Sequence, residues 1–142
     1  MTSITRRSAL AFGVVAPALI LPRLATAADL YPADAGKEIL PGVRQVDIGK
    51  IPIAFGSYKS SVVTDYLSVP GAEFPDDVMK NDMVCLILSG QYLVKHTGGG
   101  MPDHEFTVKA GGVFSCAKDQ HEWDKNTGSV QAVMRVVDLL PA

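Results

Sequence analysis

Short apolar runs separated by turn residues are the dominant pattern of this chain after Lys59. Glycine and proline clusters such as Pro70-Gly71 and Gly98-Gly99-Gly100 end the runs, as is typical of turns between strands. No stretch after residue 28 carries a sustained 3.6-residue apolar period with helix caps. Many short strands at this spacing predict an all-β fold, an antiparallel sandwich or jelly roll. The strands are predicted at 61–69, 83–89, 91–96, 105–109, 113–116, 121–124 and 130–139.

The run at 83–89 is apolar on both faces of its predicted strand. Met83, Cys85 and Ile87 share one face, which we take to be the interior. The opposite face is formed by Val84, Leu86 and Leu88. A strand with two apolar faces needs a second covering layer, and a homodimer that packs sheet against sheet would supply it. The alternatives are that residues 28–57 cover this face, or that it docks on a different protein as the surface of an accessory protein.

The first 27 residues have the organisation of an export signal. Arg6-Arg7 lie in a polar start, an apolar run of 13 residues follows at 9–21, and Ala25-Thr26-Ala27 offers small residues for cleavage. The run is shorter than the roughly 18–20 apolar residues of a membrane span. Thr5-Arg6-Arg7-Ser8 resembles the twin-arginine export motif. We predict cleavage after Ala27 and a periplasmic or secreted protein, with no membrane span in its mature form. A general secretion signal and an uncleaved membrane anchor are the alternatives.

The remaining sequence divides into an N-terminal arm at 28–58 and a single domain at 59–142. The arm contains several prolines and one or two short strands, one of them at 43–48. The whole chain has 13 basic and 15 acidic residues, but three arginines lie in the signal segment, so 10 basic and 15 acidic residues and a net charge of −5 remain. Because the chain shows no basic patch, we do not expect it to bind nucleic acid.

Two motifs in the domain at 59–142 resemble those of the cupin family. Gly71-Ala72-Glu73-Phe74-Pro75, followed by Leu86-Ile87-Leu88-Ser89-Gly90, resembles the first cupin motif. Lys109-Ala110-Gly111-Gly112-Val113-Phe114, followed by His121 and Asn126-Thr127-Gly128, resembles the second. The resemblance covers residues 61–137. It implies an antiparallel jelly-roll β-barrel, an architecture whose interior in this family commonly holds one metal ion.

The metal ligands of the family are mostly missing from these motifs. The first motif supplies two His and one Glu in the family, and the second supplies a third His. Here Met83 stands at the Glu position, and the two His positions fall near Asp76 and Val78, or near Asp77 and Met79. Only His121 matches a family ligand, in a motif whose spacing is one residue short. Because a neutral thioether is a poor substitute for a carboxylate, the resemblance implies that the standard metal site is absent and that no cofactor is expected.

We therefore predict an exported cupin-like protein that binds a small molecule inside the barrel. His121 and Trp123 share a strand face, and if that face points inward they form the barrel mouth together with Met83, Gln91 and Lys80. His121 would then be the hydrogen-bonding or acid–base group. The alternative for His121 is a structural role in which its ring bonds to the backbone, and the default for Lys80 is exposure to solvent.

A metal-dependent enzyme of the oxygenase or isomerase type is the alternative function. A divalent metal ion would bind His121 with Asp76 or Asp77, and Cys85 or Cys116 would add a thiolate. The two cysteines are more simply interpreted as buried free thiols than as a disulfide or a redox site.

His96 and His104 flank the glycine loop at 98–100 and are expected to face each other across a hairpin. Two imidazoles in that position could hold a surface metal ion. A solvent-exposed pair without a metal is the simpler interpretation.

Overall fold

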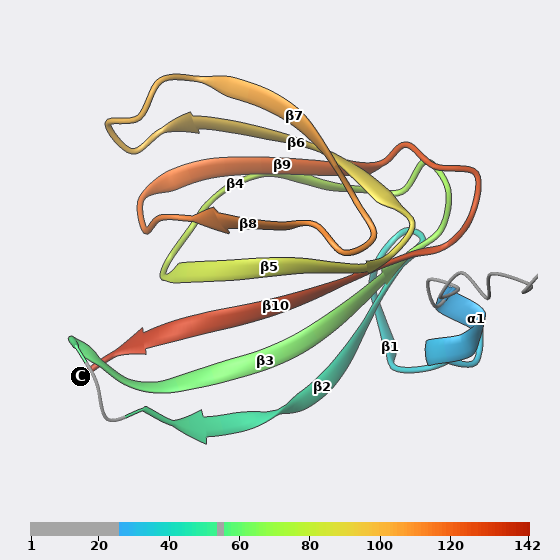
Figure 1. Cartoon of the computed structure of the whole chain (residues 1–142), viewed down its shortest axis with the longest axis horizontal. Helices are drawn as coiled ribbons and strands as arrows, with labels where there is room; N and C mark the ends of the chain where they lie inside the picture. Colours follow the sequence, from blue (N-terminus) through green and yellow to red (C-terminus); the bar gives the residue numbers. More distant parts are fainter. Residues whose placement is uncertain (1–25, 54–55) are drawn as a thin grey trace, which may run out of the picture.

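The computed structural model of the chain describes residues 26–53 and 56–142 (Figure 1). Apart from one short helix, the regular structure of the described residues consists of antiparallel strands, which confirms the predicted all-β class. The described elements are α1 (Ala27–Leu30), β1 (Lys37–Leu40), β2 (Val43–Pro52), β3 (Tyr58–Ser68), β4 (Glu73–Val78), β5 (Asp82–Ser89), β6 (Gln91–Gly98), β7 (His104–Lys109), β8 (Val113–Cys116), β9 (Gln120–Asn126) and β10 (Ala132–Pro141). Neither described range contains a helix with the length and apolarity to cross a membrane. The predicted export signal lies almost wholly at 1–25, outside the described residues.

The strands form two sheets that face each other. One sheet has six strands in the order β1-β2-β3-β10-β5-β8, and the other has four in the order β4-β9-β6-β7. Figure 1 shows the long strands β2, β3 and β10 in one layer and β4, β6, β7 and β9 in the other. No backbone ladder joins the two sheets within the described ranges. The predicted jelly roll is therefore an open two-layer sandwich, which corrects the expectation of a closed barrel.

The apolar core lies between the two sheets. Met83, Cys85 and Ile87 were predicted to face the interior, and the structure confirms it, because Cys85 and Ile87 belong to the buried core and Met83 packs against it. The Tyr92 hydroxyl of β6 donates a hydrogen bond to Ser68 Oγ of β3 at 2.9 Å and so links the two layers. The other buried members of the core are Val94, Val108, Ala132, Met134 and Val136.

The N-terminal arm covers part of the outer face of the six-stranded sheet. Tyr31 and Ala35 of the arm pack against the buried cluster that contains Leu67 of β3 and Val133 of β10. Asp65 is fully buried on this face, where it accepts two hydrogen bonds from Arg135, at 2.8 and 2.9 Å, and one from the Tyr31 hydroxyl. The arm thus covers the Leu88 end of this face, and Val84 and Leu86 are half-exposed. A homodimer stays a prediction.

The apolar pattern did not predict α1 or β4. The strand β4 lies at the edge of the four-stranded sheet and pairs only with β9, and its register shifts between Phe74 and Asp77, where Pro75 interrupts the ladder. Most of its residues are exposed, so the alternation of apolar and polar residues that marks a half-buried strand is missing. Pro75 and the acidic pair Asp76-Asp77 therefore resemble a turn in the sequence, although their backbone is extended.

Candidate functional site

The strand β9 presents a row of polar side chains to the interior. Burial alternates along it, so that Gln120, Glu122, Asp124 and Asn126 are buried and the residues between them are half-exposed. Glu122 pairs with His96 of β6, and Asp124 pairs with Val94 of the same strand. Two carboxyl groups therefore enter the space between the sheets from adjacent inward positions of one strand.

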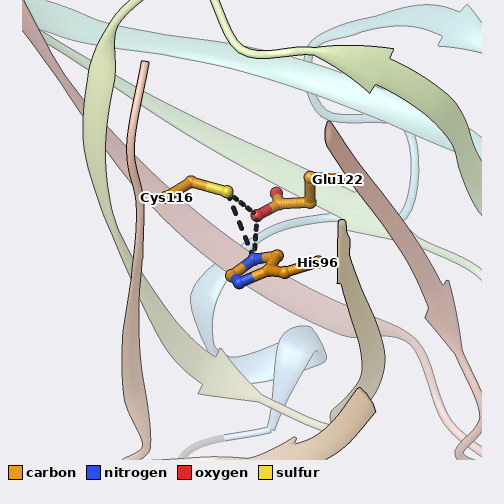
Figure 2. Close-up of side chains that lie close together, drawn as sticks. All are labelled: His96, Cys116 and Glu122. Carbon is orange, nitrogen blue, oxygen red and sulfur yellow. Dashed lines mark hydrogen bonds and ion pairs between the residues drawn. The ribbon is translucent and has the colours of Figure 1, made fainter. Parts of the chain in front are cut away.

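Glu122 forms a buried cluster with His96 and Cys116. His96 Nε2 lies 2.7 Å from Glu122 Oε2, Cys116 Sγ lies 3.2 Å from His96 Nε2, and the Cys116 thiol donates a hydrogen bond to Glu122 Oε2. All three side chains are almost fully buried. Figure 2 shows them converging from three different strands, which are β6, β8 and β9. The cluster therefore depends on the fold and not on any local sequence motif.

Aromatic rings surround the His96 imidazole. The rings of His104, Phe106 and Phe114 lie 5.1, 5.3 and 5.9 Å from it, centroid to centroid. His96 and His104 are register partners across the hairpin, as the sequence suggested, but His96 is buried and only His104 is exposed. This corrects the expectation of a solvent-exposed pair. The apolar wall lowers the local dielectric constant and so strengthens the polar contacts of His96.

The two carboxyl groups of β9 differ in their affinity for a proton. Burial favours protonation of Glu122, but hydrogen bonds from His96, Asp124 and Cys116, together with the charge of the imidazole, outweigh it, so the pKa of Glu122 is lowered. Burial, followed by the negative charge of Glu122, raises the pKa of Asp124 well above its usual value. Glu122 is therefore the ionised member of the pair, and Asp124 is the member that holds a proton most tightly.

Both cysteines are buried free thiols, as the sequence analysis favoured. Burial, followed by the charges of Glu122 and Asp124, raises the pKa of Cys85. Burial and the hydrogen bond to Glu122 raise the pKa of Cys116 well above its usual value. Because the thiolate is the reactive form of cysteine, neither residue has the environment of a nucleophile at neutral pH.

A cavity of about 400 Å3 opens between the sheets beside this cluster. Glu122 and Asp124 line it together with Asp77 and Asp138. Burial raises the pKa of Asp138. The Oδ1 atom of Asp124 is buried and has no hydrogen-bond partner in the described part of the chain. The remaining lining is mostly apolar and consists of Ile39, Leu40, Tyr66, Phe74, Pro75, Met79, Met83, Met134 and Val136.

The chain was compared with known proteins through its sequence and its fold. No protein-family model and no curated protein matches the sequence. An RmlC-like cupin from Shewanella frigidimarina superposes with a TM-score of 0.57 at 15% identity, over 75% of this chain and 82% of that chain. KdgF from a Halomonas species gives 0.55 at 12% identity, over 72% and 84%. The Cnp3 cupin domain of Schizosaccharomyces pombe gives 0.55 at 18% identity, over 69% of this chain but only 64% of the yeast chain. The chain has the cupin fold. At these identities the likeness establishes the architecture and leaves the function to be argued from the site.

The metal site expected of a cupin does not fit the residues of this chain. A thioether, that of Met83, stands at the family's Glu position and lines the cavity, where Asp77 faces it from β4. The donors on this side are therefore one thioether and carboxylates, and a site of three imidazoles and one carboxylate is not formed there.

Most of the site residues predicted from sequence lie outside the cavity. Met83 and Asp77 line it. His121 is on the outer face of β9, where its Nδ1 lies 3.4 Å from Asp76 Oδ1 and both side chains are largely exposed. Trp123 shares that outer face and packs under the Lys95 ammonium group, 5.1 Å from its ring centroid.

The other two predicted ligand-binding residues are also away from the cavity. Gln91 donates a hydrogen bond from Nε2 to Thr127 Oγ1 at 3.1 Å, on the exposed side of the turn that follows β9. Lys80 is exposed in the turn between β4 and β5. The structure therefore brings together Met83 and Asp77 of the predicted set and adds Glu122, Asp124 and Asp138 to them.

The sequence contained one signal for Glu122. The second cupin motif is one residue short when it is anchored on His121, so the next residue, Glu122, stands at the full spacing. Asp119, in the turn before β9, has a φ of 68°, so this turn is tighter than its lack of glycine suggested. The short spacing therefore indicated that the inward-facing residue of this motif is Glu122 and not His121.

Proposed function

We propose that this cupin-fold protein binds a small organic cation, an amine with an apolar body, in the cavity between its sheets. The observation that carries the proposal is the unpartnered Asp124 Oδ1, a buried acceptor on the wall of the cavity. Leaving such an acceptor unsatisfied costs about 1–3 kcal/mol, which a ligand N–H donor would recover. Within the described residues, four carboxyl groups and no basic side chain line the cavity, so a cation is the ligand that its charge favours.

The apolar lining suits the body of such a ligand. A cavity of about 400 Å3 lies within the range of roughly 300–1,000 Å3 that is usual for small-molecule sites. Tyr66 and Phe74 both line it, with their rings edge to face and 5.3 Å apart, so that an ammonium group also meets aromatic surface. Three methionines, Met79, Met83 and Met134, add flexible apolar surface that adapts to ligands of different shape.

The test is a binding comparison between probes that share a shape and differ in charge. Phenethylammonium, 2-phenylethanol and 3-phenylpropionate are titrated into the purified protein and followed by calorimetry. We expect the cation to bind, the alcohol to bind at least about tenfold more weakly, and the anion not to bind. Asp124→Leu, which removes the buried acceptor, should weaken cation binding at least about tenfold, whereas Asp34→Leu, the same change at an exposed position, should leave it unchanged. Binding of the anion as tight as that of the cation would contradict the proposal.

Export through the twin-arginine route is a second part of the proposal. Arg6-Arg7, the apolar run at 9–21 and the small residues at 25–27 support the twin-arginine route and a periplasmic or secreted location. Replacing both arginines by lysine should retain the protein in the cytoplasm in a fractionation experiment. Mass spectrometry of the exported protein should find a chain that begins at Ala28.

A further inference from the structure

The geometry points to a transition-metal site at His96, Cys116 and Glu122, for a borderline divalent ion of which zinc is the best match. The three donor atoms lie within 4.8 Å of one another, and each approaches the other two. They come from β6, β8 and β9 and meet in the space that Figure 2 shows between the three side chains. This inference goes beyond the proposed binding function, because it requires no ligand in the cavity.

The donor set selects the kind of metal. Imidazole nitrogen, cysteine sulfur and carboxylate oxygen are the three ligand types that zinc takes in proteins. Hard ions such as magnesium and calcium prefer oxygen ligands and would gain little from Cys116 and His96. The set also differs from three imidazoles and a carboxylate, because two of its members, His96 and Cys116, stand at none of the family's ligand positions.

One of the three contact distances already matches a bound ion, and the other two would have to lengthen. Ligand atoms bound to zinc at about 2.0–2.3 Å in a tetrahedron lie roughly 3.3–3.7 Å from one another. The Sγ–Nε2 distance of 3.2 Å is close to this spacing, whereas the 2.7 Å between Nε2 and Oε2 is shorter and the contact between Sγ and Oε2 is shorter still. Both short contacts end on Glu122 Oε2, so a rotation of the Glu122 side chain away from His96 and Cys116 would open the triangle to the size that the ion needs.

The three contacts of this cluster share at most two protons. The Cys116 thiol and His96 Nε2 offer one proton each at most, and both approach Glu122 Oε2. The remaining contact, between Sγ and Nε2, then has no proton of its own. A metal ion would bond all three atoms at once, and the thiol proton would pass to solvent when the ion binds.

The surroundings are those of a protected metal site. Phe106 and Phe114 wall the cluster on the side of His96, which keeps water out and strengthens the bonds to the ion. Asp124 lies within hydrogen-bonding reach of Glu122 and would hold that carboxylate in place. Three protein ligands leave a fourth position of a tetrahedron free, and Glu122 also lines the cavity, so the ion would lie next to the proposed ligand site.

Cobalt substitution tests the inference directly. The purified full-length protein is freed of metal with a chelator and titrated with Co2+, and then with Zn2+ in competition. We expect one equivalent of Co2+ to produce a thiolate-to-cobalt charge-transfer band and the visible bands of a tetrahedral ion, and Zn2+ to remove both. Failure of the native protein to show the charge-transfer band at one equivalent would overturn the inference, whatever the variants do.

Two matched pairs of variants locate the site. Cys116→Ser should abolish the charge-transfer band and weaken Zn2+ binding by more than about 100-fold, while Cys85→Ser, a change at the other buried thiol, should keep the band. His96→Ala should lose the tetrahedral spectrum and His121→Ala should keep it. Retention of the band in Cys116→Ser, or its loss in Cys85→Ser or His121→Ala alone, would overturn the assignment.

The result is separable from the proposed cation binding. Phenethylammonium binding measured in excess chelator reports the cavity alone, and the cobalt spectrum without the amine reports the metal alone. In folded protein, Zn2+ should also raise the unfolding temperature of the native chain and leave that of Cys116→Ser unchanged.

Discussion

The two faces of the four-stranded sheet each hold, at β9, a histidine beside a carboxylate, and the two pairs differ in almost everything else. On the inner face His96 and Glu122 lie 2.7 Å apart with both side chains nearly inaccessible to solvent. On the outer face His121 and Asp76 lie 3.4 Å apart with 43% and 61% of their side chains exposed. Water screens the outer pair, whereas the inner pair is held by a thiol and by aromatic rings. Residue type alone does not identify a site, because the environment decides what the same two groups can do.

The largest expected difference between the two faces is in stability. His96→Ala leaves the Glu122 carboxylate buried without its imidazole partner, and breaking a buried pair in this way costs about 3–5 kcal/mol of the free energy of unfolding. His121→Ala, on the outer face, should change it by no more than about 0.5 kcal/mol. Urea unfolding of the two variants and the native protein measures both values. Equal losses in the two variants would remove the distinction between the faces.

A second difference should appear in the pH dependence of cation binding. Burial raises the pKa of Asp138 on the cavity wall, so this carboxyl gains its proton at a higher pH than an ordinary aspartate. An ammonium ligand prefers the ionised form, and its affinity should therefore fall as the pH decreases through that raised pKa, by up to about tenfold per pH unit for one coupled proton. Asp138→Asn should flatten this part of the profile, and the exposed Asp119→Asn should not. Calorimetric titrations of phenethylammonium across the acidic range provide the profile.

The raised pKa of Asp138 also affects the stability of the protein without a ligand, and there the effect of pH has the opposite direction. Because the pKa of Asp138 is higher in the folded state than in the unfolded chain, its contribution to stability is fully present at low pH. That contribution is lost as the pH rises through the folded-state value. The free energies of unfolding of Asp138→Asn and the native protein should therefore diverge as the pH rises. Divergence as the pH falls would contradict a raised pKa of Asp138 in the folded state.

The smallest expected effect concerns the outer face itself. The Lys95 ammonium lies over the Trp123 ring and also pairs with Glu105 at 2.9 Å, but both partners of that ion pair are about half exposed. Lys95→Met, which keeps most of the side-chain volume, should lower the free energy of unfolding by less than about 1 kcal/mol. It should leave cation binding in the cavity unchanged. A loss of ligand affinity in this variant would place the ligand on the outer face.

Sequence reasoning succeeded where apolar alternation is strong and local. The run at 83–89 predicted its inner face correctly, because Cys85 and Ile87 are core residues whose pattern needs no knowledge of the rest of the chain. The cupin resemblance predicted the architecture that the solved structures share. Closure into a barrel could not be read from the pattern, since it depends on ladders between strand edges, and the described strands form two separate sheets.

The site was harder to predict because its residues are distant in sequence and polar. His96 is 26 residues from Glu122, and Cys116 is 20 residues from His96, so no short motif contains them. In β9, apolar alternation would have placed Trp123 inside, but the inner face is taken by carboxyl groups whose partners come from other strands. Only long-range pairing makes the burial of Glu122 favourable, and a pattern within one strand does not record it.

The central claim is that the ligand enters the inner face of β9 and not the outer one. Methyl-labelled methionine NMR tests it, because Met79, Met83 and Met134 line the cavity whereas Met101 is exposed in the β6–β7 loop. During a phenethylammonium titration, the three cavity methyl signals should shift in a saturable way, and the Met101 methyl and the Trp123 indole N–H should stay in place. Shifts of the Trp123 indole without shifts of the cavity methyls would contradict the account.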